Sequence, residues 1–190
     1  DISKFRSQSG IITLDPGFKN TGSTKSAITF LNGETGILNY RGYSIEQLAD
    51  HSTFTEVSYL LIYGELPTAV ELKAFENATT QHTLVHEDFK TILDGFPSTS
   101  HPMGVLSSLV TALNAFYRQS TSLEKSPEAI SLSIIRLLAK MPTFAAWSYK
   151  KKMGQPVNYP NNNLDYCSNF LHMMFALPTM QYDINPVVTK

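Results

Sequence analysis

The spacing of apolar residues predicts that the chain beyond residue 43 is helical. Apolar positions there recur at intervals of three and four residues, which places them on one face of a helix. The clearest stripes are Val105, Leu109, Leu113 and Phe116, followed by Ile130, Ile134, Leu137 and Met141. We expect both stripes to be buried, in a set of about seven helices with short connections.

The segment before residue 44 has a different pattern and predicts a β-hairpin over residues 26–43. Its two arms, Ala27–Leu31 and Thr35–Tyr40, are rich in residues that favour strands. Asn32-Gly33 suits a two-residue type I′ turn between them, because both residue types tolerate a positive φ. The predicted fold class is therefore mainly α, with a short N-terminal β-hairpin.

Capping patterns set the predicted ends of several helices. Ser44–Gln47 and Thr68–Glu71 have the form of a capping box, in which two side chains bond otherwise unpaired backbone amides. Gly64 is placed to end a helix that starts near Thr55. The helix that begins after Thr68 is expected to continue to about His86.

Prolines and glycines divide the second half of the chain. Ser126 and Pro127 fit the cap and first turn of a helix. Pro142 lies inside the same helical pattern, where its ring removes a backbone hydrogen bond, so we expect a break or kink and a restart at Thr143. Gly154 would end that helix. Further helices are predicted over Asp88–Asp94, from Pro102, and over Leu164–Ala176 with Asn163 as the cap.

Composition and charge narrow the class of protein. Hydrophobic residues make up 42% and charged residues 16%, as in globular proteins. The formal net charge is −1, so no overall field attracts nucleic acid or an acidic membrane. No apolar run approaches the roughly 20 residues that span a bilayer. The single cysteine, Cys167, cannot form an internal disulfide, and we expect a cytoplasmic protein.

Three consecutive lysines at residues 150–152, close to Trp147 and Tyr159, raise the alternative of a nucleic-acid surface. Lysines in the last turn of a helix, however, complement the negative end of its dipole, and Gly154 follows as a stop signal. A nucleic-acid site would need further Lys or Arg on the same face. We favour the structural role.

Other candidate groups are isolated. His82 and His86 have helical spacing, but Glu87 follows the pair instead of lying inside it as in the zinc motif HExxH, and no metal site is predicted. Arg136 and Lys140, one helical turn apart, form a cationic pair that suits a phosphate. No catalytic constellation emerges from the residues alone.

Several segments together resemble the citrate synthase family, in particular its hexameric bacterial type. They are LDPGFKNTGSTKSAITFLNGETGILNYRGYSIEQLA (residues 14–49), EVSYLLIYGELPT (56–68), SHPMGVL (100–106), RLLAKMPTFAAWSYKKKMGQPVNYP (136–160) and LDYCSNFLHMMFALP (164–178). The resemblance covers nearly all of the chain from about Ile12 onward, in order, which is more specific than any single motif.

The resemblance implies an enzyme that condenses acetyl-CoA with oxaloacetate and water to citrate and CoA, as a homo-oligomer of the hexameric type, with no metal and no cofactor. It implies acid–base chemistry by a carboxylate and two histidines, with arginines on the substrate carboxylates. Those groups lie beyond residue 190 in the family's pattern, so none is assigned to this chain, which we expect to be inactive alone. The implied domains are an N-terminal extension over residues 1–43 and part of the helical large domain over residues 44–190.

One site of the family, an NADH inhibitory site of some hexameric enzymes, has matching positions in this chain. The resemblance assigns it to His82, Thr83, Tyr117, Arg136 and Lys140. Three positions depart from the NADH-sensitive pattern: Gln81 replaces Arg, Leu84 replaces Met and Thr179 replaces Cys. The loss of one cation is expected to weaken binding by about tenfold.

Two alternatives stay open. A 2-methylcitrate synthase would use propionyl-CoA, and the residues that select the acyl group lie outside this chain. A non-catalytic helical module that senses a nucleotide or binds another protein would use Arg136 and Lys140, or an exposed apolar patch.

Overall fold

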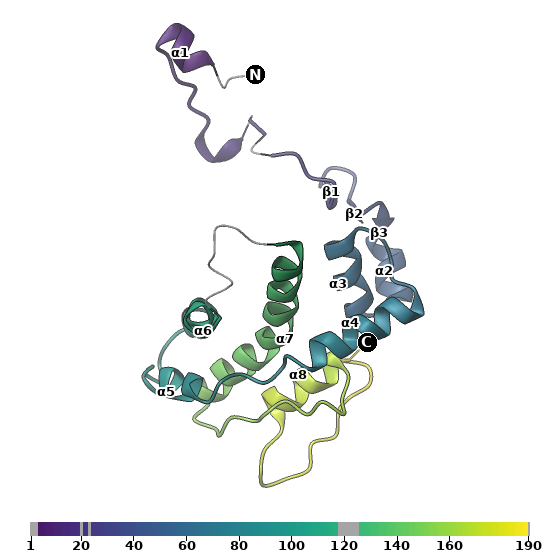
Figure 1. Cartoon of the computed structure of the whole chain (residues 1–190), viewed down its shortest axis with the longest axis vertical. Coiled ribbons are helices and arrows are strands. Elements are labelled where there is room, and N and C mark those ends of the chain that lie inside the picture. Colours follow the sequence, from purple (N-terminus) through teal and green to yellow (C-terminus); the bar gives the residue numbers. More distant parts are fainter. Residues whose placement is uncertain (1–3, 20, 23, 118–125, 190) are drawn as a thin grey trace. The chain divides into compact units, whose positions relative to one another are not determined.

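The computed structural model describes residues 4–19, 21–22, 24–117 and 126–189. The chain divides into two compact units, Asp1–Ile45 and Glu46–Lys190, which are treated separately below. Figure 1 shows a three-stranded sheet in the first unit and a set of packed helices in the second. The mainly α fold class is confirmed.

The first unit combines two short helical turns with an antiparallel sheet. Its elements are α1 (Phe5–Ser9), η1 (Pro16–Phe18), β1 (Thr29–Asn32), β2 (Ile37–Tyr40) and β3 (Tyr43–Ser44), with strand order β1-β2-β3. The predicted hairpin is confirmed, and in it Asn32 pairs with Ile37. The third strand was not predicted, because two residues carry no periodic signal.

The turn of the hairpin differs from the prediction. Four residues separate β1 from β2, and Gly33 does not have the positive φ that a type I′ turn requires. Instead the Asn32 side-chain oxygen accepts hydrogen bonds from the amides of Glu34 and Thr35, at 3.0 and 3.2 Å. Arg41 and Gly42, between β2 and β3, both have positive φ, so the type I′ signature belongs to that turn.

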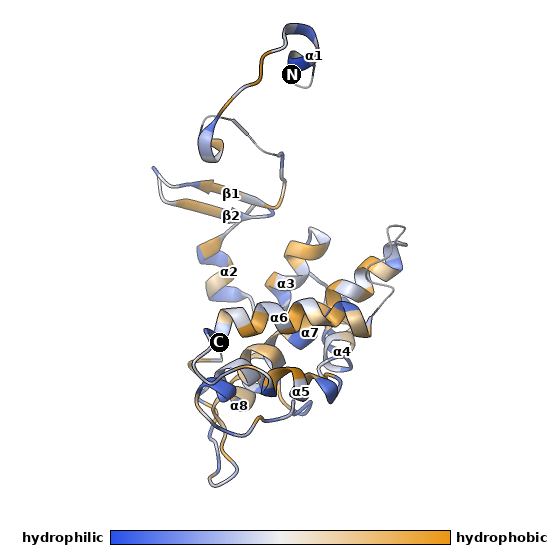
Figure 2. Cartoon of the chain, turned by 90° about the vertical axis from the view of Figure 1, so that its left-hand side faces the viewer, coloured by the Kyte–Doolittle hydropathy of each residue, from blue (hydrophilic) through white to orange (hydrophobic). Residues whose placement is uncertain are grey.

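None of the described residues of the first unit is fully buried. Figure 2 shows apolar (orange) colour along β1, β2 and the extended segment after α1. The most exposed of these side chains are Ile11, Ile12, Leu14 and Leu31. An apolar surface of this extent in so small a unit is typical of a segment that packs against another surface.

The helices that follow are α2 (Ile45–His51), α3 (Phe54–Tyr63), α4 (Ala69–Thr80), α5 (Asp88–Asp94), α6 (Pro102–Phe116), α7 (Pro127–Lys152) and α8 (Tyr166–Phe175). Their core is formed by α5, α6 and α7. The Phe89 ring of α5 lies 4.9 Å from Phe144 of α7 and 4.4 Å from Phe116 of α6, between ring centroids. The predicted stripe of α6 is confirmed: Val105, Leu109 and Leu113 are buried in this core.

The predicted start of α4 is confirmed and its predicted end is wrong. Thr68 and Glu71 form both bonds of the capping box. The helix ends at Thr80 rather than near His86, because the chain turns away and its carbonyls bond to side chains of α7. His82 therefore lies in the connection to α5, not on a helix with His86.

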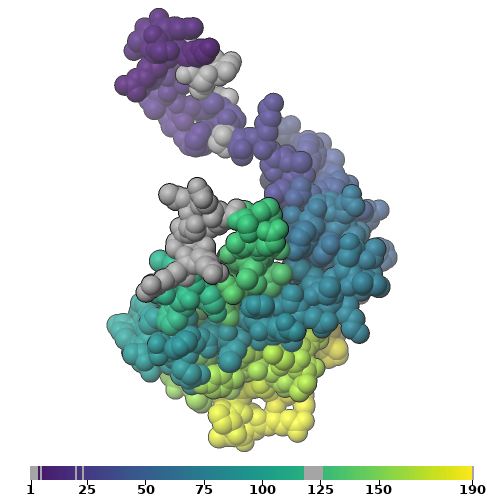
Figure 3. All heavy atoms as spheres, in the orientation of Figure 1, coloured from purple at the N-terminus to yellow at the C-terminus, as the bar shows by residue number. Residues whose placement is uncertain are grey.

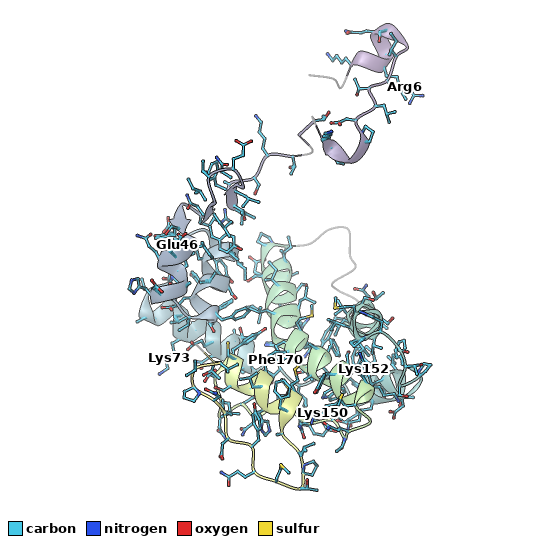
Figure 4. The ribbon with its side chains drawn as sticks, turned by 180° about the vertical axis from the view of Figure 1, so that it is seen from behind. Arg6, Glu46, Lys73, Lys150, Lys152 and Phe170 are labelled. Atoms are coloured by element: carbon cyan, nitrogen blue, oxygen red, sulfur yellow. The ribbon has the colours of Figure 1, made fainter. Side chains whose placement is uncertain are left out.

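Helix α7 differs in part from one prediction and wholly from another. It continues through Pro142 without a break, although its ribbon bends part-way along in Figures 1 and 4. The predicted stripe is wrong, since Ile130 and Leu137 are 45% and 43% exposed. The buried residues gather in the second half of the helix instead, where α4, α5, α6 and α8 pack around it: Ala139, Lys140, Pro142, Thr143, Phe144, Ala146, Trp147, Ser148 and Lys150.

By length and composition, α7 is also apolar enough to cross a membrane. The central helix of a soluble protein meets the same criterion. Two of its buried side chains, Lys140 and Lys150, are cationic and bonded to backbone carbonyls of neighbouring segments. Such bonds are those of a helix packed within protein.

Helix α8 begins two residues later than predicted. Its cap is Asp165 rather than Asn163: one Asp165 carboxylate oxygen accepts from the Ser168 amide at 2.8 Å. Met173 is buried in contact with Thr143 of α7, whose hydroxyl lies 3.5 Å from the Met173 sulfur. Cys167 is half-buried, and burial raises the pKa of its thiol, which agrees with a packing role.

Candidate functional site

Three of the predicted site residues meet where α6 ends beside α7. The Arg136 guanidinium carbon lies 4.6 Å from the centre of the Tyr117 ring, and the Lys140 ammonium lies 5.7 Å from it. Two cations on one turn of α7 thus share one aromatic face, which favours positive charge there. We call Tyr117, Arg136 and Lys140 the basic cluster.

Lys140 is the most buried member of the basic cluster, with 2% of the side chain exposed. Its ammonium donates to the backbone carbonyls of His82 and Leu84, at 2.6 and 2.5 Å. Burial, with the neighbouring charge of Arg136 as a second cause, lowers the pKa of Lys140 to about 8. In the part of the chain that the structure describes, no carboxylate forms an ion pair with it.

Arg136 has hydrogen-bonding capacity to spare. Its Nε atom is buried and has no hydrogen-bond partner among the described residues. A cavity of about 310 Å³ opens beside it, lined by Val110, Thr111, Leu113, Asn114, Tyr117, Ser133, Arg136 and Leu137. A guanidinium with free donors at the edge of a cavity can bind an anion with charge-assisted hydrogen bonds.

The other two predicted site residues point elsewhere. The His82 ring nitrogen Nδ1 lies 2.8 Å from the Ala78 carbonyl, so only the backbone of His82 reaches the basic cluster. The Thr83 hydroxyl donates to the Asn162 side-chain oxygen at 2.9 Å, on the other side of the connection. The structure therefore groups Tyr117, Arg136 and Lys140, and separates the side chains of His82 and Thr83 from them.

The connection between α4 and α5 is fastened to α7 at three consecutive carbonyls. Lys140 binds those of residues 82 and 84, and the Thr143 hydroxyl donates to that of Thr83 at 3.2 Å. No periodic signal in the sequence indicates these three hydrogen bonds, because they join side chains of one helix to backbone about 60 residues away.

Thr179 belongs to the segment that follows α8. It lies between Leu177 and Met180, which pair as an isolated bridge, and it is exposed. In the space-filling view of Figure 3 the C-terminal residues (yellow) stand out from the end of the helical unit. No hydrogen bond joins Thr179 to the basic cluster in the described part of the chain.

The three lysines at the end of α7 do not share one surface. Lys150 is fully buried and donates to the Gln155 side chain at 2.9 Å and to the Ala176 carbonyl at 2.7 Å (Figure 4). Burial lowers the pKa of Lys150. Lys151 pairs with Asp94 at 3.6 Å. Sequence reasoning missed the interior position of Lys150, and only its apolar neighbours in the helix hinted at it.

The remaining histidine and cysteine positions form no metal centre in the described residues, where no three His, Cys, Asp or Glu side chains lie together. His101, which precedes Pro102, caps α6: its Nδ1 accepts from the Met103 amide at 3.2 Å. This role explains its place before the helix without any chemistry.

Comparisons with known proteins identify the family. A sequence model described as "Citrate synthase, C-terminal domain" matches residues 17–190. The chain belongs to the citrate synthase family. Citrate synthase 1 of Mycobacterium tuberculosis H37Rv is 50% identical over 183 residues, which is 96% of this chain and 42% of the relative. Citrate synthase of Corynebacterium glutamicum is 46% identical over 190 residues, which is 100% of this chain and 43% of the relative.

Solved citrate synthase structures have the same fold. The enzyme from Pyrobaculum aerophilum matches with a TM-score of 0.75 at 34% identity, over 88% of this chain and 45% of that one. The enzyme from Thermotoga maritima matches with a TM-score of 0.72 at 30% identity, over 86% and 42%. The chain thus spans less than half of the length of the citrate synthases it matches.

Proposed function

We propose that this chain acts as part of a citrate synthase that condenses acetyl-CoA with oxaloacetate to give citrate and CoA. The observation that carries the proposal is the identity of 46–50% with curated citrate synthases across at least 96% of the chain. The support lies in the sequence identity rather than in the fold, because one fold can host many functions.

The catalytic groups of the proposed enzyme lie in the part of the protein that the relatives have and this chain does not. Neither of two cavities in the described part of the chain, of about 310 and 320 Å³, is lined by a histidine. A general acid or base must be within hydrogen-bond reach of bound substrate. The 320 Å³ cavity is lined by two carboxylates, Glu76 and Asp165, but not by the histidines that the proposed chemistry also requires.

The preference for acetyl-CoA over propionyl-CoA is tested on the protein encoded by the complete gene. CoA release is followed with oxaloacetate and either acetyl-CoA or propionyl-CoA. We expect a kcat/KM that is higher for acetyl-CoA by about tenfold or more, since one methylene in an apolar pocket has an effect of that order. A preference for propionyl-CoA would replace the proposal with 2-methylcitrate synthesis.

The basic cluster is proposed to bind a phosphate of an inhibitory nucleotide such as NADH. Catalysis itself is proposed to need no cofactor and no metal. The free donor of Arg136 beside a cavity supports this. Lys140 already holds two carbonyls, and Gln81 provides no cation, so we expect weak binding. Arg136→Gln should weaken NADH binding by about tenfold, while Lys152→Gln, a control on the surface, should not change it. Activity that does not respond to millimolar NADH would remove this part of the proposal.

The protein is further proposed to work as a cytoplasmic homo-oligomer. Helix α6 supports an interface, because its exposed hydroxyls bond to carbonyls of their own helix: Ser107 and Ser108 to Gly104, and Thr111 to Ser107, at 2.8–3.0 Å. Such a face can lose water without leaving polar groups unpaired. Ser108→Glu should shift the protein toward monomer in sedimentation, whereas Thr91→Glu on α5 should not.

A further inference from the structure

A second cavity, of about 320 Å³, lies where α3, α4, α7 and α8 come together. Figures 1 and 4 show α4 and α8 close to each other in this region. Its lining is dominated by carboxamides and hydroxyls: Thr55, Asn77, Thr79, Thr80, Thr83, Asn162, Asn163 and Asn169. We call it the Asn/Thr cavity. It is separate from the basic cluster, with which it shares no lining residue.

The floor of the Asn/Thr cavity holds a buried amide with an unused donor. Asn169 is 5% exposed, and its side-chain oxygen accepts from the Asn161 amide at 2.9 Å. No hydrogen bond from its Nδ2 group is found among the described residues, and Nδ2 is not one of the buried side-chain atoms without a partner there, so it is accessible from the cavity that Asn169 lines. An accessible donor on an otherwise buried side chain is suited to a ligand that brings an acceptor.

The rim can both donate and accept. Asn77 and Asn163 are exposed carboxamides with two donors and an acceptor each. The oxygen of Asn162 is taken by the Thr83 hydroxyl, which leaves its Nδ2 group for a ligand. Leu164, Pro142 and Met173 supply apolar wall. A mixed set of this kind matches hydroxyl groups, which donate and accept at the same atom.

The charge of the cavity disfavours anions. Glu76 and Asp165 line it, and no Lys, Arg or His side chain does. Glu76 has no ion pair within the described ranges, and Asp165 holds its carboxylate at the start of α8. The cavity also lies at the C-terminal end of α4, which has no basic residue in its last turn, and at the start of α8, where the Asp165 carboxylate offsets the positive end of the helix dipole. Carboxylates and phosphates would be repelled.

We propose that the Asn/Thr cavity binds a small polyhydroxy compound, uncharged or carrying an ammonium group. A ligand oxygen accepts from Asn169, and hydroxyl or ammonium groups donate to Glu76 and Asn77. The volume fits a ligand at the small end of the usual range. The proposal goes beyond citrate synthesis, because acetyl-CoA, oxaloacetate and citrate are all anions, and it does not depend on the proposed function.

The test is a titration of the 190-residue chain with three probes of similar shape and different charge: glucosamine, glucose and glucose 6-phosphate. Binding is followed by amide chemical shifts in NMR. We expect saturable shifts at residues of α4 and α8, with affinity in the order glucosamine, glucose, glucose 6-phosphate. The phosphate should bind at least about tenfold more weakly than glucose.

Two variants locate the site. Glu76→Gln should reduce the preference for glucosamine over glucose by several fold, and Glu46→Gln, a matched exposed glutamate on α2, should leave it unchanged. Asn169→Asp keeps the acceptor for Asn161 and removes the donor, so it should abolish glucose binding. If that variant does not fold, Asn77→Ala on the exposed rim provides the same test, with an expected loss of several fold.

Three outcomes would overturn the proposal. One is the absence of saturable shifts with any probe. Another is equal binding of glucose and glucose 6-phosphate. The third is a rise in Tm that all polyols cause alike without localised shifts, which is the effect of solutes excluded from the protein surface.

Discussion

At the scale of single residues, two lysines of α7 determine how the helical unit is joined. Lys140 bonds the connection after α4, and Lys150 bonds the carbonyl that ends α8. Both are cations that the interior holds through neutral carbonyls and amides, without a carboxylate partner in the described residues. Such groups cost desolvation and are retained where their hydrogen bonds have no substitute.

Replacing Lys140 should therefore destabilise the protein. In Lys140→Met the carbonyls of residues 82 and 84 lose their donor, and we expect the free energy of unfolding to fall by about 1–3 kcal/mol. Urea denaturation measures this loss. Lys152→Met, at an exposed position in the last turn of the same helix, is the control and should change the free energy of unfolding by less than about 0.5 kcal/mol. An unchanged free energy of unfolding in Lys140→Met would show that these hydrogen bonds do not stabilise the protein.

Lys140 should also make stability depend on pH. Its pKa is lowered from 10.5 to about 8 in the folded state, so between these values the unfolded chain binds more protons than the folded one. The free energy of unfolding contributed by this residue then rises with pH from about 8 to 10.5, by at most about 1.4 kcal/mol per pH unit. The difference between the protein and Lys140→Met, measured across that window, isolates the effect. A difference that stays constant or falls with pH would contradict it.

At the scale of elements, local chemistry predicts where helices start better than where they end. The capping box at Thr68, the cap at Ser126 and the stripe of α6 were all readable, because each depends on residues within a few positions of one another. The end of α4 and the buried half of α7 depend on what packs against them. Those contacts join distant residues, which periodicity does not reveal.

The candidate site shows the same division. Their spacing predicted that Arg136 and Lys140 lie on one face of α7, and in the structure both cations lie over the Tyr117 ring. The position of Tyr117 against that face, the separation of Thr83 and the Asn/Thr cavity all result from helix packing. Family resemblance supplied the residues, and only the packing shows which of them meet.

The α4 capping box provides a direct test at this scale. In Thr68→Ala the Glu71 amide loses its acceptor, and the Glu71 carboxylate loses the Thr68 hydroxyl, at 3.4 and 2.7 Å respectively. We expect a loss of about 0.5–2 kcal/mol in the free energy of unfolding. Thr91→Ala, at an exposed position inside α5, should cost far less. Equal effects of the two changes would mean that the cap does not hold the start of α4.

At the scale of the whole molecule, the chain carries a helical unit with a core of its own and a first unit without buried residues in its described part. It spans 42–43% of the length of its curated citrate synthase relatives. Of the two cavities described above, one is lined by Glu76 and Asp165 and the other by Tyr117 and Arg136, and neither is lined by a histidine. These features agree with the proposal that catalysis depends on groups outside this chain.

The measurement that tests this most directly is CoA release from acetyl-CoA and oxaloacetate, made in parallel on the 190-residue chain and on the product of the complete gene. We predict turnover by the complete protein and none by the 190 residues. Turnover by the 190 residues alone would contradict the account, because the catalytic groups would then be among the residues described above.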